Sequence, residues 1–216
     1  PAIGAGTSPV APTTDIEGNQ RPNPEGSNPD MGAYESSLGV YIPKPTLVTV
    51  NQDGSALFTN ITDAVSWASS GDTILISPGT YQETIELVDA DLHLASYYLT
   101  TGDTSFISTT IIDGMNQDSP IYIRASDQNN RISNIKLTGL SIINGEYGDN
   151  GSVGSGIYAA FADSVQGDHL VIRDNISSIE GGGIHVVQSN HASFESIVIK
   201  NNQATKGGGI FSQGTD

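Results

Sequence analysis

The sequence GGGIHV at residues 181–186 returns as GGGIFS at residues 207–212, 26 residues further on. A looser copy, GSGIY, stands upstream at residues 154–158. The apolar triplet at residues 170–172 recurs at residues 197–199, 27 residues later. A fixed period in this range is typical of a stacked solenoid. Since the segments between the glycines are short, β-branched and alternating, each period predicts one turn of a parallel β-coil rather than a helical repeat.

The expected fold class is all-β: a right-handed, single-stranded parallel β-helix with a short N-terminal capping helix. That helix is predicted at about residues 59–69, where apolar residues recur at i, i+3, i+4 and i+7 and Thr59 or Asn60 can cap the first turn. A lone amphipathic helix before a solenoid is expected to cover the exposed end of its hydrophobic stack.

Two series of strands are expected to stack from coil to coil. The first consists of residues 92–94, 121–123, 157–159, 184–186 and 210–212. The second consists of residues 110–113, 140–144, 170–174 and 197–201, and each of its members ends in Asp or Asn. Such residues bond their own backbone and tolerate a positive φ, so a corner follows each of them. A polar insert at residues 145–155 is predicted to form a loop.

The charge balance excludes several classes of partner. The chain has 216 residues, enough for one sizeable domain, and a formal net charge of −16 although only 15% of its residues are charged. Such a surface repels nucleic acid and anionic lipid, and it repels acidic polysaccharide unless a cation bridges the two. There is no cysteine, so disulfides and thiolate chemistry are excluded. No apolar stretch approaches membrane-spanning length, so no membrane insertion is expected.

Several phrases of the sequence are similar to those of a known fold family. The pieces GDTILISPGTYQETI (71–85), TTIIDG (109–114) and LTGLSIING (137–145), together with the GGGI repeats, resemble the start of a β-helix of the pectin-lyase-like group. The Gly-Gly-Ile pattern also resembles the repeats of polymorphic outer-membrane adhesins. These resemblances imply the fold and a secreted or surface location, whereas one fold hosts many functions.

The first 35 residues resemble the closing segment of bacterial surface β-helix proteins of the choice-of-anchor type. We therefore interpret residues 1–35 as the tail of a preceding β-helix domain, residues 36–46 as a linker and residues 47–216 as the first coils of the next domain. In this interpretation the chain is a fragment of a longer bacterial protein that is secreted or displayed on the outer surface.

Ring-bearing residues are the first candidates for a binding site. If the aliphatic residues of the first strand series point inward, the residue between them points out. The outward residues are His93, Tyr122, Tyr158, His185 and Phe211. Planar rings stack on sugar faces. The resemblance implies that this face corresponds to the one that often carries the sugar-binding groove in β-helix enzymes. The alternative is that rings in register only stabilise the sheet, by about 0.2–1 kcal/mol per cross-strand pair.

Charged residues give weaker signals. Asp113 and Asp174 are expected about 10 Å apart on alternate coils, where turn residues bonded to local backbone are the better interpretation. Within residues 1–35, Arg21 is interpreted as a structural clamp held by the carboxylates of Asp15, Asp30 and Glu35. A calcium site at these carboxylates stays an alternative. The lone residues His169 and His191 are expected to be surface histidines.

No catalytic residues, metal ligands or cofactor are predicted, with calcium as the open alternative. The preferred function is a secreted or cell-surface β-helix that binds glycans or other surfaces without catalysis of its own, with a polysaccharide or cell-surface glycan as the candidate partner. The rival is a polysaccharide lyase or glycoside hydrolase on neutral or weakly charged polymers. An enzyme should show a cleft lined, within about 10 Å, by at least two carboxylates or by a carboxylate cluster and a base. An adhesin should show a flat ladder of Asn, Ser and Thr. Ice binding needs a flat Thr array, which the outward rings disfavour.

Overall fold

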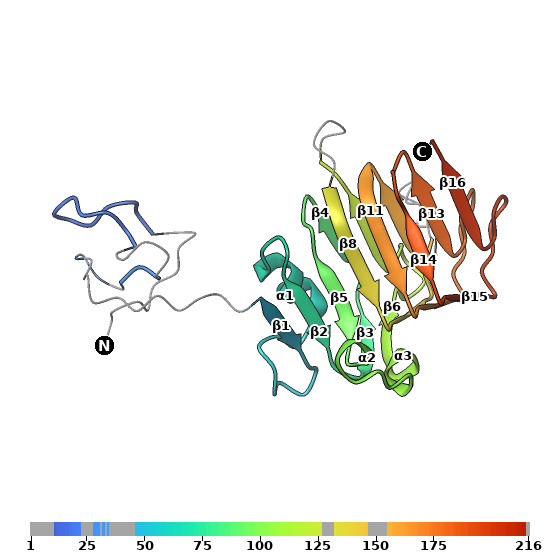
Figure 1. Cartoon of the computed structure of the whole chain (residues 1–216), viewed down its shortest axis with the longest axis horizontal. Helices are drawn as coiled ribbons and strands as arrows, with labels where there is room; N and C mark the ends of the chain where they lie inside the picture. Colours follow the sequence, from blue (N-terminus) through green and yellow to red (C-terminus); the bar gives the residue numbers. More distant parts are fainter. Residues whose placement is uncertain are drawn as a thin grey trace. The chain divides into compact units, whose positions relative to one another are not determined.

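The computed structural model describes residues 11–22, 28–30, 32, 34, 46–126, 132–146 and 155–214. The chain divides into two compact units, Pro1–Pro45 and Thr46–Asp216. The second unit is a right-handed parallel β-helix, as predicted, with successive coils stacked side by side (Figure 1). No helix in the described part of the chain is long and apolar enough to cross a membrane.

Three parallel sheets form the walls of the β-helix. The first sheet contains, in spatial order, β1 (Leu47–Val50), β2 (Thr73–Ile76), β5 (His93–Ser96), β8 (Ile132–Thr138), β11 (Ala162–Asp168) and β14 (Ser193–Glu195). The second contains β4 (Ile85–Val88), β7 (Ile121–Arg124), β10 (Ile157–Ala160), β13 (Ile184–Val187) and β16 (Ile210–Gln213). The third contains β3 (Gly79–Gln82), β6 (Thr110–Asp113), β9 (Ser141–Ile143), β12 (Val171–Arg173) and β15 (Val198–Lys200).

Aliphatic side chains in matching register fill the space between the sheets. In the second sheet Ile157 pairs with Ile121 on one side and with Ile184 on the other, and all three are fully buried. In the third sheet Ile172 pairs with Ile142 and Ile199. Alternation along each strand thus sends one set of side chains into the core and leaves the other set on the outer face.

Helix α1 (Ile61–Trp67) packs on β1, β2 and β4, as expected for a cap on the N-terminal end of the core. Asn60 is its N-cap, because its side chain accepts a hydrogen bond from the backbone N–H of Asp63. The carboxylate of Glu83 accepts from the backbone N–H groups of Ile61 and Thr62 and so satisfies two more donors of the first turn.

The corner after the third sheet depends on a buried asparagine. Asn175 is fully buried, and its Oδ1 accepts from the N–H of Gly145 at 2.7 Å while its Nδ2 donates to Oδ1 of Asn202 at 2.9 Å. A Cβ on Gly156 would lie 2.7 Å from Nδ2 of Asn175, so the glycine leaves room for this amide. The amide ladder thereby links three successive coils.

The assignment of His93 to the first predicted strand series was wrong. His93 lies in β5 of the first sheet, between Thr73 and Lys136, whereas the rung neighbour of Tyr122 on the preceding coil is Glu86 in β4. The matching 27-residue step was misleading because each coil contains three strands, and an equal spacing can join strands of different sheets.

Two short helices, α2 (Tyr98–Thr101) and α3 (Ser105–Thr109), were not predicted, because neither is long enough to show an apolar stripe. Both follow β5 and interrupt the coil before β6, at the end of the first sheet where β5 leaves it (Figure 1). The predicted insert at residues 145–155 falls mostly outside the described residues.

Candidate functional site: a polar groove on the first sheet

Two hollows lie on the outer face of the first sheet. One has a volume of about 330 Å³ and is lined from β8, β11 and β14. The other, of about 320 Å³, is lined from β2, β5 and β8 and from the turns that precede β2 and β5. Both include Lys136, so they meet at this residue and form one groove across five strands. We call this surface the polar groove.

The register of the sheet builds the polar groove from two rows of outward side chains. The first row is Thr73, His93, Lys136, Gln166 and Ser193, one from each strand. The second row is Thr138, Asp168 and Glu195, two residues further along β8, β11 and β14. At about 4.8 Å per strand, the four steps of the first row extend about 19 Å along the coil axis.

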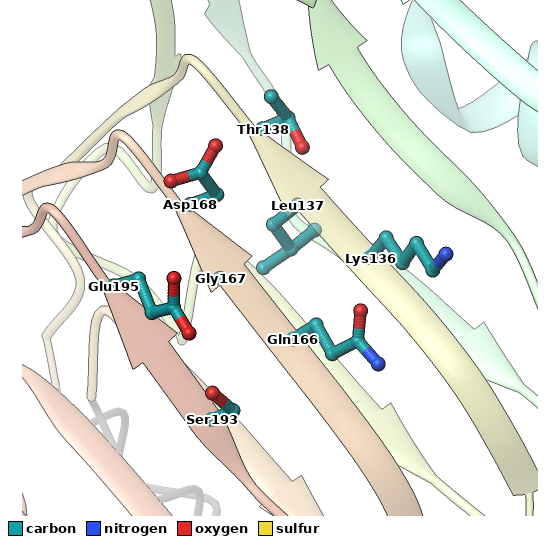
Figure 2. A pocket seen from close by; sticks show the side chains of 8 residues that line it. All are labelled: Lys136, Leu137, Thr138, Gln166, Gly167, Asp168, Ser193 and Glu195. Atoms are coloured by element: carbon teal, nitrogen blue, oxygen red, sulfur yellow. The ribbon is translucent and has the colours of Figure 1, made fainter.

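Figure 2 shows how these rows lie on three neighbouring strands, with Lys136, Gln166 and Ser193 on one side and Asp168 and Glu195 on the other. Leu137 and Gly167 stand between the rows, and their positions face the core. Within the described residues, neither Nζ of Lys136 nor the carboxylate of Glu195 forms a hydrogen bond or ion pair with another side chain.

His93 lies in the polar groove as a neutral side chain. Its Nε2 is 2.9 Å from Oγ1 of Thr138, and the hydroxyl of Thr138 is largely buried. Burial lowers the pKa of His93, and the positive charge of Lys136 lowers it further. The imidazole thus contributes hydrogen-bonding capacity to the groove without adding positive charge at neutral pH.

Asp168 joins the groove to a pair of rings at its edge. Its Oδ1 accepts a hydrogen bond from Nδ1 of His169 at 2.6 Å. The imidazole of His169 in turn stacks on the ring of Tyr98, with centroids 4.5 Å apart and planes 30° apart. His169 is partly exposed at the surface and has partners on two sides.

The remaining four predicted ring residues do form a ladder, on the outer face of the second sheet. Tyr122, Tyr158, His185 and Phe211 are successive rung partners. Tyr122 and Tyr158 stack at 4.8 Å with planes 22° apart, and the next two contacts are edge-on at 5.3 Å. We call these four side chains the ring ladder; its role in glycan binding stays a prediction.

His185 is the most enclosed member of the ring ladder. Its side chain is only 7% exposed, and neither ring nitrogen has a hydrogen-bond partner among the described residues. Oε2 of Glu180 lies 3.9 Å from its Nε2, and Lys206 pairs with the other oxygen of Glu180 at 2.9 Å. Burial lowers the pKa of His185, and the charge of Glu180 opposes this effect only in part.

The predicted turn carboxylates are bonded locally. Asp113 accepts from the N–H of Met115 at 2.9 Å and from the side-chain amide of Asn144 at 3.0 Å. Asp174 accepts from Arg173 and from the side-chain amide of Asn201, and the hydrogen bond from Arg173 lowers its pKa. This pattern agrees with a role in the corners of the coil.

The predicted clamp lies in the first unit. The carboxylate of Asp15 accepts from the N–H groups of Glu17 and Asn19 and organises a turn there, and Arg21 donates to the carbonyl of Gly32. Pairing of Arg21 with Asp15 and Asp30 stays a prediction, and Glu35 falls outside the described residues. In the described part of the chain no three potential ligand side chains converge on a metal site, and calcium stays untested.

Sequence reasoning missed most of the polar groove. Gln166 and Ser193 are 27 residues apart, as are Asp168 and Glu195, so the period that identified the coils also linked these pairs. The signal was overlooked because β8, β11 and β14 carry many polar residues and lack aliphatic triplets such as that of residues 170–172.

Comparisons with known proteins show similarity at the level of fold. No protein-family model matches the chain, and no curated protein matches it. One similar solved structure is a pectin methylesterase variant in complex with a hexasaccharide, with 16% identity and a TM-score of 0.49 over 69% of this chain. Another is the pectin methylesterase from Aspergillus niger, with 11% identity and a TM-score of 0.41 over 81% of this chain and 77% of that one.

The chain spans about half of the first of these structures, 48% of its length. At these identities and TM-scores the similarity gives no argument about activity. The fold and the groove therefore define the class of this protein: a right-handed parallel β-helix with an open polar groove on one sheet.

Proposed function

We propose that this β-helix binds a neutral polysaccharide along the polar groove, without catalysis of its own. The main support is the continuity of the groove, since two hollows of similar size meet at Lys136 and align amide, hydroxyl, imidazole and carboxylate groups over about 19 Å. These groups suit the hydroxyls of an extended sugar chain, because each accepts or donates hydrogen bonds without requiring charge on the ligand.

The charge of the groove favours a neutral polymer over an acidic one. Asp91, Asp168 and Glu195 line it, against the single positive charge of Lys136. The formal net charge of −16 adds a long-range repulsion for anionic chains. A uronic acid polymer would need a bridging cation to bind with comparable affinity.

We further propose a secreted or cell-surface location in a bacterium. The support is the resemblance of residues 1–35 to the closing segment of bacterial surface proteins and of the glycine repeats to those of surface adhesins. In this setting the groove would attach the protein to a glycan of another surface.

A second candidate is a glycoside hydrolase that uses Asp168 and Glu195. These residues are rung partners on adjacent strands, about 4.8 Å apart at the backbone, which is close to the separation of a retaining pair. Such a pair must flank the scissile bond, whereas these two carboxylates stand side by side on one face of one sheet. A lyase needs a basic group beside a cation-binding acidic cluster, and the described residues form no such cluster.

The test combines binding with product release. Neutral hexasaccharides of glucan, mannan and xylan type are titrated into the full chain, with a galacturonate hexasaccharide as the acidic comparison. Reducing ends and unsaturated products are measured in parallel. Binding of a neutral oligosaccharide without product supports the proposal. Product release that Asp168→Asn abolishes would establish the hydrolase instead, and no binding to any probe would refute both.

A further inference from the structure

The corner that follows the first sheet repeats on three coils. Gly139, His169 and Ser196 come directly after the rung partners Thr138, Asp168 and Glu195. All three have a left-handed backbone, with φ of +69°, +51° and +51°. Their side-chain positions therefore stack along the coil axis at the edge of the polar groove.

The glycine makes room for an aromatic ring on one side of His169. A Cβ added to Gly139 would lie only 2.7 Å from Cβ of Tyr98, so no larger residue fits there while Tyr98 keeps its place. The N–H of Tyr98 donates to Oγ of Ser96, which fixes the start of α2 beside the corner. Tyr98 then covers one face of the imidazole of His169.

On the next coil, that of β14, the residue at the corresponding corner is Ser196, because Glu195 is the rung partner of Asp168. Serine is small and this one is exposed, so no bulky side chain from that corner covers the imidazole. The side chain of His169 is accordingly 32% exposed. Its hydrogen bond to Asp168 fixes the ring in this orientation, and the carboxylate of Glu195 stands one residue away from Ser196.

We infer that this open face of His169, bounded by Ser196 and Glu195, is a sugar-stacking subsite at the edge of the polar groove. A pyranose ring places its C–H face on the imidazole, and one of its hydroxyls donates to the carboxylate of Glu195. Tyr98 supports the imidazole from behind, and Asp168 sets its tautomer by accepting from Nδ1. The inference rests on the proposed glycan binding and adds the ring contact that the two polar rows lack.

Two substitutions test the subsite from opposite directions. His169→Asn removes the ring and keeps a residue type that tolerates the left-handed backbone. Ser196→His fills the open face with a ring at a φ that histidine already adopts one coil earlier. By analogy with the energies of aromatic contacts, each change should weaken the affinity for the neutral hexasaccharide about 3- to 10-fold. Lys200→Gln, on the third sheet, is the matched control and should leave the affinity unchanged.

A direct measurement accompanies the variants. In the unmodified chain, saturation transfer from the bound hexasaccharide should reach the ring protons of His169, which needs no folded variant. Weaker binding by both variants together with this transfer supports the subsite. Unchanged affinity in both variants, or transfer that reaches Lys136 and Gln166 but not His169, overturns the subsite while the proposed function stands. If no oligosaccharide binds the unmodified chain, the proposed function and the subsite fall together.

Discussion

The ring ladder and the polar groove lie on two sheets of the same β-helix. Strand register aligns both rows, but one row consists of rings in contact and the other of mixed polar side chains. In the ring ladder each side chain contacts the next, with Tyr122 stacked on Tyr158 and His185 wedged edge-on against Phe211. In the polar groove, within the described residues, Lys136 and Glu195 have no side-chain partner. Ring contacts thus run through the whole ladder, whereas the groove combines internally bonded groups, such as His93 with Thr138, with the polar groups of Lys136 and Glu195.

In a β-helix the coil aligns the outward side chains of successive strands. Whether such a row can bind a ligand depends on how far its side chains already contact or bond to one another. Rings about 4.8 Å apart are at contact distance, so their faces are covered by their neighbours. Amide and carboxylate groups in the same spacing retain unused donors and acceptors. A row of rings is therefore weaker evidence for a glycan site than a row of mixed polar residues.

The largest effect is expected from removing polar groups of the groove. Gln166→Ala combined with Glu195→Ala should raise the Kd for the bound hexasaccharide about 10- to 100-fold, because hydrogen bonds to a charged group contribute about 1.5–3 kcal/mol. Both side chains are exposed, so the free energy of unfolding should change by less than about 0.5 kcal/mol. Isothermal titration and chemical denaturation measure the two quantities. An unchanged Kd would contradict the assignment of the site.

The reverse outcome is expected for the ring ladder. Tyr158→Ala removes a half-buried ring that contacts both Tyr122 and His185, so the free energy of unfolding should fall by about 2 kcal/mol. The affinity for the hexasaccharide should stay within twofold. Gln82→Ala, at an exposed residue of the third sheet, controls for general effects of truncation. A loss of affinity that exceeds the loss of stability would assign glycan binding to the ladder.

The sequence predicts the coil better than it predicts the site. Buried aliphatic residues at alternate positions, such as Ile121 and Ile123, can be recognised in the sequence because only inward residues must be apolar. Asp168 and Glu195 carry no such mark, since a polar residue is compatible with a turn, a loop or an outward strand position. They can be recognised as candidate site residues only when the register of β11 and β14 places them side by side.

For a related reason, the sequence pattern could not show to which sheet His93 belongs. Leu92, Leu94 and the 27-residue step fit two sheets equally well, and only the pairing of β5 with β8 decides between them. The contact of Tyr98 with His169 joins residues from different coils through a glycine at position 139. A one-dimensional pattern cannot show such a contact, because it depends on the space that a missing side chain leaves.

A smaller effect, on the pH dependence of stability, is expected from both regions. The pKa values of His185 in the ladder and His93 in the groove are both lowered by burial, so the unfolded chain binds protons first as the pH falls. The free energy of unfolding should therefore be highest above about pH 7. It should decrease as the pH falls through the unfolded pKa of about 6.5 toward the lower pKa values of the two histidines in the folded chain.

His185→Phe should remove part of this acid sensitivity, because it replaces two unpartnered ring nitrogens with carbon beside Phe211. Gln82→Asn, at an exposed side chain that does not titrate, is the control and should leave the pH profile as it was. Denaturation midpoints between pH 5 and pH 8 measure the effect. A His185→Phe profile identical to that of the unmodified chain would contradict the interpretation of His185 as a buried neutral group.

The smallest effect is expected at Tyr122, where the ladder begins. Its rung neighbour on the preceding coil is Glu86, so Tyr122 has a ring partner on one side only, at Tyr158. Tyr122→Leu keeps an apolar side chain and removes one stacked pair, so the free energy of unfolding should fall by about 0.5 kcal/mol, with unchanged affinity for the hexasaccharide. If affinity fell while stability stayed constant, Tyr122 would contact the sugar directly, and both sheets would then contribute to one binding surface.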